Sequence, residues 1–205
     1  MNSNSSSAKS PQKLRERFRE ETGRAVLEAA EQVFAEEGLH AASMSSIAER
    51  AGVAVGTLYN HFKDRDALLN ALLDERRAEL IDKIDRARAE LADEPFRKQL
   101  EGFLRALFSH FEEHGNFLRI VFSSEYGGLR KCEEMPRALY QRIELLLKIG
   151  HREKALRADP DHHFGLMLLG AVKGTFLRDK YGAPALDNKV AIDLIADFFL
   201  RGAGR

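Results

Sequence analysis

The stretch Ser43–Arg65, SMSSIAERAGVAVGTLYNHFKDR, decides how this chain folds. A helix-turn-helix needs a small residue where two helices cross, a glycine at the turn, and an apolar residue on the second helix that packs back. Ala48, Gly52 and Leu58 supply these three features in this order. The combination of spacing and residue types predicts a pair of short helices joined by a tight turn.

Outward from this stretch, the rest of the chain also has helical patterns. Only five prolines occur and no run of alternating β-branched residues is present, so we predict an all-α fold. Ser43 and Asp64 are expected to cap helices at their N-termini, and Gly38 and Gly52 to end them. The predicted helices cover residues 14–37, 43–52, 55–62, 64–92, 96–113, 116–123, 136–149, 161–181 and 188–201.

Composition and charge set limits on the domain organisation. Residues 1–13 are rich in serine and read as a disordered arm, residues 14–65 as the helix-turn-helix domain, and residues 66–205 as a helical body. The net charge is zero, from 32 basic and 32 acidic residues, which gives no general excess for nucleic acid. Residues 9–24 nevertheless hold six basic residues against three acidic ones, a local charge of +3.

Several classes of protein are disfavoured by what the sequence contains. The single cysteine, Cys132, allows no intramolecular disulfide, and no stretch resembles a signal peptide or a membrane span, so we expect a cytoplasmic protein without a membrane partner. The glycine and histidine motifs of common hydrolases and phosphate-binding enzymes are absent, so we expect no enzyme and no cofactor. An oxidation-sensing role for Cys132, beside two glutamates, stays open.

The second helix of the pair has an outer face suited to DNA. Side chains that can reach phosphates or base edges are expected on it, and small residues at its start allow close approach. Lys63 and Arg65 follow, where they can neutralise phosphates. The candidate DNA-binding residues are Ser45, Val55, Gly56, Thr57, Tyr59, Asn60, His61 and Lys63.

Between about Arg24 and Leu73 the sequence resembles the DNA-binding domain of the tetracycline-repressor family. The resemblance rests on the segments FAEEG (34–38), SIAERAGV (46–53), GTLYNHF (56–62) and KDRDALL (63–69). It implies a three-helix head joined by a long fourth helix to a variable ligand-binding and dimerisation bundle. It also implies phosphate or base contacts for Thr57, Tyr59, His61 and Lys63, with base choice left to Val55 and Asn60.

The same resemblance implies partners for the body. Repressors of this family bind palindromic operator DNA as dimers, are released by small and often apolar effectors, and dimerise through their last two helices. Here those helices are apolar on more than one side, and Gly170 and Gly174 would let another helix come close. An intrachain core is the alternative. The predicted effector-binding residues, which could equally be core, are Phe103, Leu107, Phe111, Tyr140 and Met167.

Two further questions stay open at this point. His110 and His114 are four residues apart, a spacing that can chelate a metal, but no third ligand is fixed by the sequence and Gly115 suggests that the helix is ending. We therefore predict no metal site. The alternative to a ligand-responsive regulator is a helical ligand-binding or adaptor protein without DNA binding, which the salt dependence of DNA affinity would distinguish.

Overall fold

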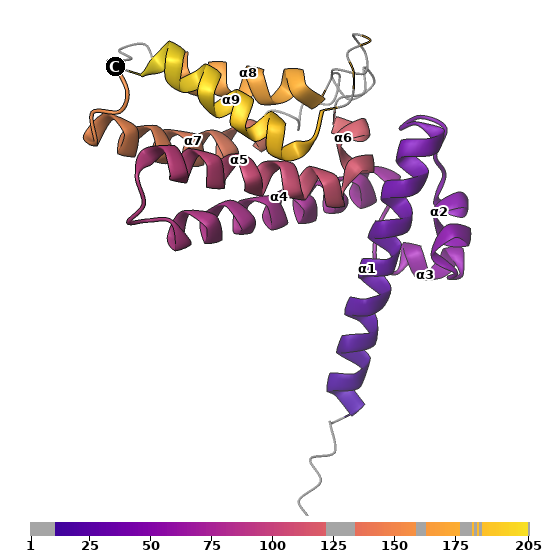
Figure 1. Cartoon of the computed structure of the whole chain (residues 1–205). Coiled ribbons are helices and arrows are strands. Elements are labelled where there is room, and N and C mark those ends of the chain that lie inside the picture. Colours follow the sequence, from indigo (N-terminus) through magenta and orange to yellow (C-terminus); the bar gives the residue numbers. More distant parts are fainter. Residues whose placement is uncertain are drawn as a thin grey trace, which may run out of the picture. The chain divides into compact units, whose positions relative to one another are not determined.

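The computed structural model describes residues 11–121, 134–158, 163–176, 182, 184 and 186–204. Their regular structure is helical, apart from one isolated bridge between Leu156 and Gly204, which confirms the predicted all-α fold. The helices, labelled in Figure 1, are α1 (Pro11–Glu37), α2 (Met44–Ala51), α3 (Val55–Tyr59), α4 (Arg65–Glu90), α5 (Phe96–Glu113), α6 (Gly115–Val121), α7 (Glu134–Arg152), α8 (His163–Phe176) and α9 (Asn188–Ala203).

The backbone forms two compact units. One holds the described parts of Met1–Glu75 and Asn116–Tyr126, and the other those of Arg76–Gly115 and Gly127–Arg205. The first unit therefore contains α1 to α3, the start of α4 and most of α6, while the second contains the rest. The functional boundary that we predict after Arg65 stays a prediction.

In the first unit, α1 packs against α2, and α2 against α3. The predicted apolar face of α1 is buried, as are the small and apolar residues Ala48 and Leu58 of the helix pair, whereas Gly52 in the turn is exposed. Helix α1 begins at Pro11, three residues before the predicted start, because proline is well tolerated in the first turn of a helix. The buried side chains in this set are Val26, Ala29, Ala30, Val33, Phe34, Ile47, Ala48 and Leu58.

The ends of α2 are fixed by the two residues predicted to fix them. Ser43 Oγ accepts a hydrogen bond from Ser46 N at 3.0 Å, and Ser46 Oγ accepts one from Ser43 N at 3.1 Å, which forms a reciprocal capping box. Gly52 has a φ of 67°, a left-handed conformation that glycine adopts without a steric cost. The turn then closes through a hydrogen bond from Val53 N to Ala48 O at 3.0 Å.

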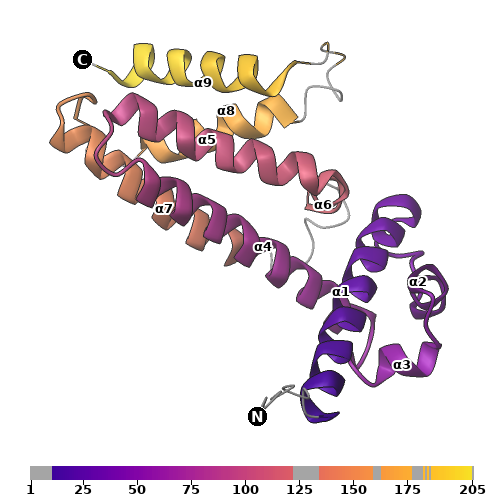
Figure 2. The same cartoon turned by 60° about the horizontal axis from the view of Figure 1, so that its bottom comes forward.

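The second unit is a helical bundle arranged around α5. Helix α5 packs against α7 and α9, and α8 packs against α7 and α9. Figures 1 and 2 both draw α8 and α9 side by side on one side of α5, with α4 on its other side. Most side chains of α5 are buried, which explains why its sequence is so rich in phenylalanine and leucine. Arg97 of α5 pairs with Asp197 of α9 at 2.6 Å at the edge of this core.

A two-point ion pair ties α4 to α7. Arg142 donates to Asp85 from Nη2 at 2.7 Å and from Nε at 3.3 Å. The hydrogen bonds from Arg142 hold the pKa of the Asp85 carboxyl below its ordinary value. Because the folded-state pKa is lowered, the pair stabilises the fold above the unfolded pKa of about 3.9, and this contribution is lost as the pH falls through the lower folded value.

We therefore expect Arg142→Ala to lower the free energy of unfolding by about 1 kcal/mol at pH 7, a modest figure because both side chains are partly exposed. The loss should shrink toward zero as the pH is lowered below the folded pKa of Asp85. Urea unfolding at neutral and acidic pH measures both effects. Arg137→Ala, at an exposed position on the same helix, is the control and should leave the midpoint unchanged. An equal loss at both pH values would contradict the assigned pair.

Candidate nucleic-acid interface and effector site

Helix α3 presents part of the predicted DNA-binding set to solvent. Tyr59 is 55% exposed although it directly follows the fully buried Leu58. The side chain of Leu58 therefore points into the core, and that of Tyr59 points toward solvent. Val55 and Gly56 are also exposed at the start of the helix, and Thr57 is half-buried. A short helix with a buried leucine and an exposed tyrosine can lie on a flat or grooved partner without losing its own core.

Asn60 and His61, which we predicted on the outer face of α3, lie beyond its end, and Lys63 follows the helix as predicted. The helix ends at Tyr59 instead of Phe62, and Asn60, His61 and Lys63 follow it. The physical reason is the next cap: Asp64 Oδ1 accepts a hydrogen bond from Ala67 N at 2.8 Å, so the chain must leave the helical path before Asp64. Asn60 and Lys63 are exposed and His61 is half-buried, with its ring centroid 6.2 Å from that of Phe62.

Arg65, which we expected to neutralise a phosphate, makes contacts within the first unit. Its guanidinium donates to the carbonyl oxygen of His40 at 3.1 Å and pairs with Asp66 at 3.3 Å. These bonds hold the turn between α1 and α2 against the start of α4. Ser45, in contrast, is exposed in the first turn of α2, as a phosphate contact requires. In the basic segment Arg24 is exposed, whereas the side chains of residues 9–20 and Cys132 lie outside the described set.

The five predicted effector-binding residues differ in how far they are buried. Phe103, Leu107 and Phe111 are buried in α5, and the ring of Phe111 lies edge-on against Phe176 with centroids 4.8 Å apart. Tyr140 is half-buried beside α8, whereas Met167 is 62% exposed. The phenylalanines of α5 fill the core because helices α7 to α9 pack directly onto them. Their role in effector binding stays a prediction.

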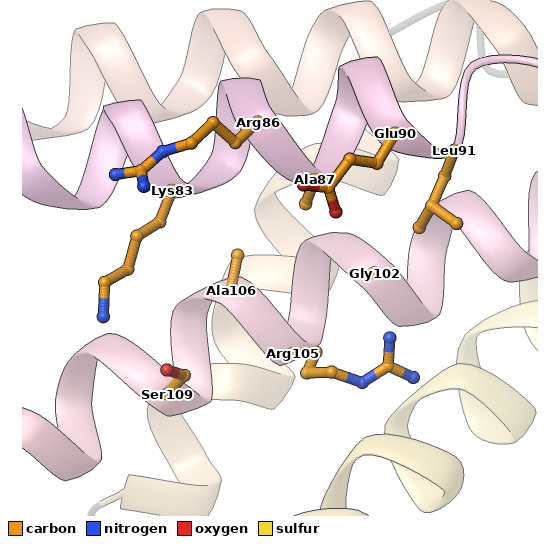
Figure 3. A pocket seen from close by; sticks show the side chains of 9 residues that line it. All are labelled: Lys83, Arg86, Ala87, Glu90, Leu91, Gly102, Arg105, Ala106 and Ser109. Carbon is orange, nitrogen blue, oxygen red and sulfur yellow. The ribbon is translucent and has the colours of Figure 1, made fainter.

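A groove between α4 and α5, which the sequence pattern did not indicate, carries three basic side chains. It has a volume of about 370 Å³. Figure 3 shows Lys83, Arg86 and Glu90 on the α4 side and Arg105 and Ser109 on the α5 side. The remaining lining residues are small or apolar: Ala87, Leu91, Gly102 and Ala106. We name this the cationic groove. Its chemistry suits a ligand with an anionic group and an apolar part.

Two local contacts shape the cationic groove. A Cβ atom on Gly102 would clash with the end of the Leu91 side chain, so glycine at this position leaves room for that side chain. Lys83 donates to Glu113 at 2.5 Å, and Arg86 donates to the carbonyl oxygen of Asp82 at 3.3 Å. Arg105 is exposed at the rim. A second groove, with a volume of about 570 Å³, lies beside α7 and is lined in part by Arg88 and Leu145.

Helices α8 and α9 share an exposed apolar surface. Phe198 is 72% exposed, an unusual state for a phenylalanine, and four other large apolar residues of the two helices are also more than half exposed. A Cβ added to Gly170 or Gly174 would meet nothing within 4 Å. We name this set the α8–α9 surface: Leu166, Met167, Val190, Leu194 and Phe198. Among the described residues, no helix combines the length and the apolar character that a bilayer crossing requires.

Comparison with known proteins gives the same reading of the first unit. Residues 26–72 match the sequence profile of the bacterial regulatory proteins of the tetR family. Over 108 residues the chain is 33% identical to the HTH-type transcriptional activator FasR of Mycolicibacterium smegmatis, which covers 53% of this chain and 48% of that protein. The chain thus spans about half the length of this curated relative.

Solved structures resemble the whole chain in fold. The fatty acid degradation regulator FadR from Bacillus halodurans has a TM-score of 0.78 at 22% identity, over 88% of this chain and 95% of that one. The transcriptional regulator FadR from Bacillus subtilis, solved in complex with stearoyl-CoA, has a TM-score of 0.73 at 21% identity, over 87% and 98%. The similarity in fold covers 87–88% of this chain, whereas the family motifs in its sequence lie between residues 34 and 69.

Proposed function

We propose that this chain, whose residues 26–72 match the tetR family of bacterial regulatory proteins, is a cytoplasmic, ligand-responsive transcriptional regulator that binds palindromic operator DNA as a homodimer. The observation that carries the proposal is the exposed set on and after α3, within the segment that matches the family. Tyr59, Asn60 and Lys63 are solvent-exposed there, directly beside the buried Leu58. Ser45 of α2 supplies a further hydroxyl group for a phosphate.

Selection from a pool of duplexes with a randomised central segment tests the DNA-binding part of the proposal. The full-length protein should enrich an inverted repeat, because two identical heads read two half-sites about one helical turn apart or a multiple of it. Enrichment of a single, non-repeated site would argue against the dimer. Failure to enrich any sequence would favour the alternative of a ligand-binding or adaptor protein without DNA binding.

The α8–α9 surface supports the proposed dimer. Both helices carry apolar side chains that are exposed to solvent. No atom lies within 4 Å of a Cβ at Gly170 or Gly174, so a partner helix could approach closely there. Burial of such a surface in a two-fold interface would remove a large apolar area from water, at roughly 25 cal/mol per Å². In a two-fold dimer, the α8–α9 surface of one copy would cover the same surface of the other copy.

Phe198→Glu is therefore expected to convert the dimer to a monomer, because it places a charge in the middle of the apolar interface. Sedimentation velocity at micromolar concentration measures the change, and circular dichroism should show unchanged helicity since the side chain is exposed in the protomer. Asp193→Ala, at an exposed polar position of the same helix, should stay dimeric. A Phe198→Glu protein that remains dimeric would refute the proposed interface.

We further propose that the effector is a fatty acyl-CoA. The FadR structure from B. subtilis was solved in complex with stearoyl-CoA, and a relative that is 38% identical over 60 residues is the fatty acid metabolism regulator protein of B. subtilis. The cationic groove independently suits an anionic ligand, because Lys83, Arg86 and Arg105 line it together with apolar groups. Phosphate groups of coenzyme A would find charged hydrogen-bond donors there, and the neighbouring apolar core would favour an acyl chain.

Release of selected DNA by stearoyl-CoA tests this effector class. We expect stearoyl-CoA to lower the operator affinity, whereas free coenzyme A and stearate alone should have much weaker effects. Arg105→Glu should raise the stearoyl-CoA concentration needed for release by about 10-fold, equivalent to one lost charged hydrogen bond. Arg88→Glu, which changes a residue of α4 in the second groove, is the matched control. An Arg105→Glu response equal to that of the control would exclude the cationic groove.

A further inference from the structure

Three metal-ligand side chains meet between α4 and α5, and none of them lines either of the two grooves. They are Glu79 of α4 with His110 and His114 at the end of α5. One ligand atom of each lies within 4.8 Å of the others, and His114 Nε2 is 3.2 Å from Glu79 Oε2. Tetrahedral zinc, with bonds of about 2.0–2.1 Å, places its ligand atoms about 3.3 Å apart. One edge of such a site is therefore already formed, and small rotamer changes would form the others.

The turn that carries the two histidines keeps its helical spacing. Helix α5 ends at Glu113, but His114 N still donates to the carbonyl oxygen of His110 at 3.0 Å. The two imidazoles consequently lie on one face, with ring centroids 4.8 Å apart. The glycine at position 115 follows this last turn and does not interrupt it. The doubt that the sequence raised about this pair is thereby removed.

We propose that Glu79, His110 and His114 form a binding site for one transition-metal ion per chain, of the zinc class, with one coordination position open to water or another ligand. Two imidazoles and one carboxylate are a donor set that zinc and its first-row neighbours prefer, whereas magnesium and calcium need mostly oxygen ligands. An ion held by these three residues would link α4 to α5 directly.

The burial of the three residues fits this role. His110 is fully buried, so its imidazole is held inside the bundle beside the other two ligand side chains. His114 and Glu79 are partly exposed, which leaves an entry path for an ion from solvent. A site with one buried and two accessible ligands can bind and release its ion without unfolding the bundle.

Nearby positive charge limits the affinity without excluding the ion. Arg76 Nη1 lies 3.1 Å from Glu79 Oε1 and 3.2 Å from Oε2, and Lys83 pairs with Glu113. Glu79 can keep Arg76 on Oε1 while Oε2 binds the metal, as carboxylate ligands with hydrogen-bonded second oxygens do. Because Arg76 is buried, its charge selects for ions with a strong preference for imidazole over ions held by charge alone.

Cobalt substitution tests the proposal on the full-length, untagged protein after treatment with a chelator. We expect one equivalent of Co²⁺ per chain to give the visible absorption of a four-coordinate site, Zn²⁺ to displace it, and Zn²⁺ to raise the Tm. Glu79→Gln and His114→Gln should each weaken Zn²⁺ binding by about 100-fold or more. His40→Gln, at an exposed histidine outside the site, is the control and should bind as the parent does.

Three results would each overturn the proposed metal site. Absence of both cobalt absorption and a Zn²⁺-induced shift in Tm in the parent protein would overturn the proposal, as would undiminished binding in His114→Gln. Because Glu79 also pairs with the buried Arg76, circular dichroism must confirm that Glu79→Gln is folded, and His114→Gln decides if it is not. Loss of binding in His40→Gln to the same extent would assign the ion to scattered surface histidines and would also overturn the site.

Discussion

Leu58→Ala is expected to destabilise the first unit by about 2–5 kcal/mol, the usual cost of a fully buried leucine replaced by alanine. Leu58 is completely buried, and its carbonyl oxygen also accepts hydrogen bonds from His61 N at 2.9 Å and Phe62 N at 2.8 Å. The side chain thus anchors α3, while the backbone carbonyl, which alanine keeps, closes the turn that follows it. In a small helical unit whose total stability is of the order of 5–15 kcal/mol, such a loss exposes the helix pair to unfolding.

Two measurements follow the effect of Leu58→Ala. Amide hydrogen exchange should show lost protection in α2 and α3, while the amides of α5 and α9 in the second unit keep theirs. DNA affinity should fall along with the stability of the first unit. Wild-type exchange rates in α2 and α3 of the variant would contradict the central packing role of Leu58.

Tyr59→Ala should have the complementary result, a loss of DNA affinity without a loss of stability. The Tyr59 side chain is 55% exposed, so truncation removes little packing and should change the free energy of unfolding by less than about 0.5 kcal/mol. If the phenol contacts a phosphate, the lost charged hydrogen bond is worth about 1.5–3 kcal/mol, which is roughly 10- to 100-fold in affinity.

Fluorescence anisotropy with a selected operator measures the effect of Tyr59→Ala on DNA affinity. Tyr59→Phe separates the contribution of the hydroxyl group from that of the ring. The phenylalanine variant keeps the ring and loses only the hydroxyl, so an affinity close to that of Tyr59→Ala would assign the contact to the hydrogen bond. An affinity close to the parent would assign it to ring packing against the sugar-phosphate backbone. Unchanged affinity in both variants would remove Tyr59 from the interface.

Helix ends marked by a strong local signal could be predicted from the sequence. Ser43 and Gly52 bound α2 as expected, and Pro95 and His114 flank α5 over the predicted residues, Phe96–Glu113. In each case the deciding interaction lies within a few residues of the chain. The predicted end of α3, at Phe62, was wrong. The helix ends earlier because Asp64 caps the N-terminus of α4, and the chain must leave the helical path before it.

Features that depend on packing between distant segments could not be predicted. Glu79 lies 31 residues before His110, and only the approach of α4 to α5 places its carboxylate beside the two histidines. Met167 has the same apolar character as buried residues of α8, yet it faces outward, and no periodicity distinguishes a core face from a face kept for a partner. The contacts of Arg65 could not be predicted for a related reason, since its carbonyl partners belong to the turn after α1.

We propose that this chain binds operator DNA through the exposed residues on and after α3. The salt dependence of operator binding tests this proposal most directly. Anisotropy titrations should compare the selected operator with a scrambled duplex of the same composition across a range of salt. Because phosphate neutralisation releases counterions, operator affinity should fall by at least about 100-fold between about 50 and 200 mM salt, and the scrambled duplex should bind far more weakly throughout. Equal, weak binding of both duplexes at the lowest salt would contradict the claim.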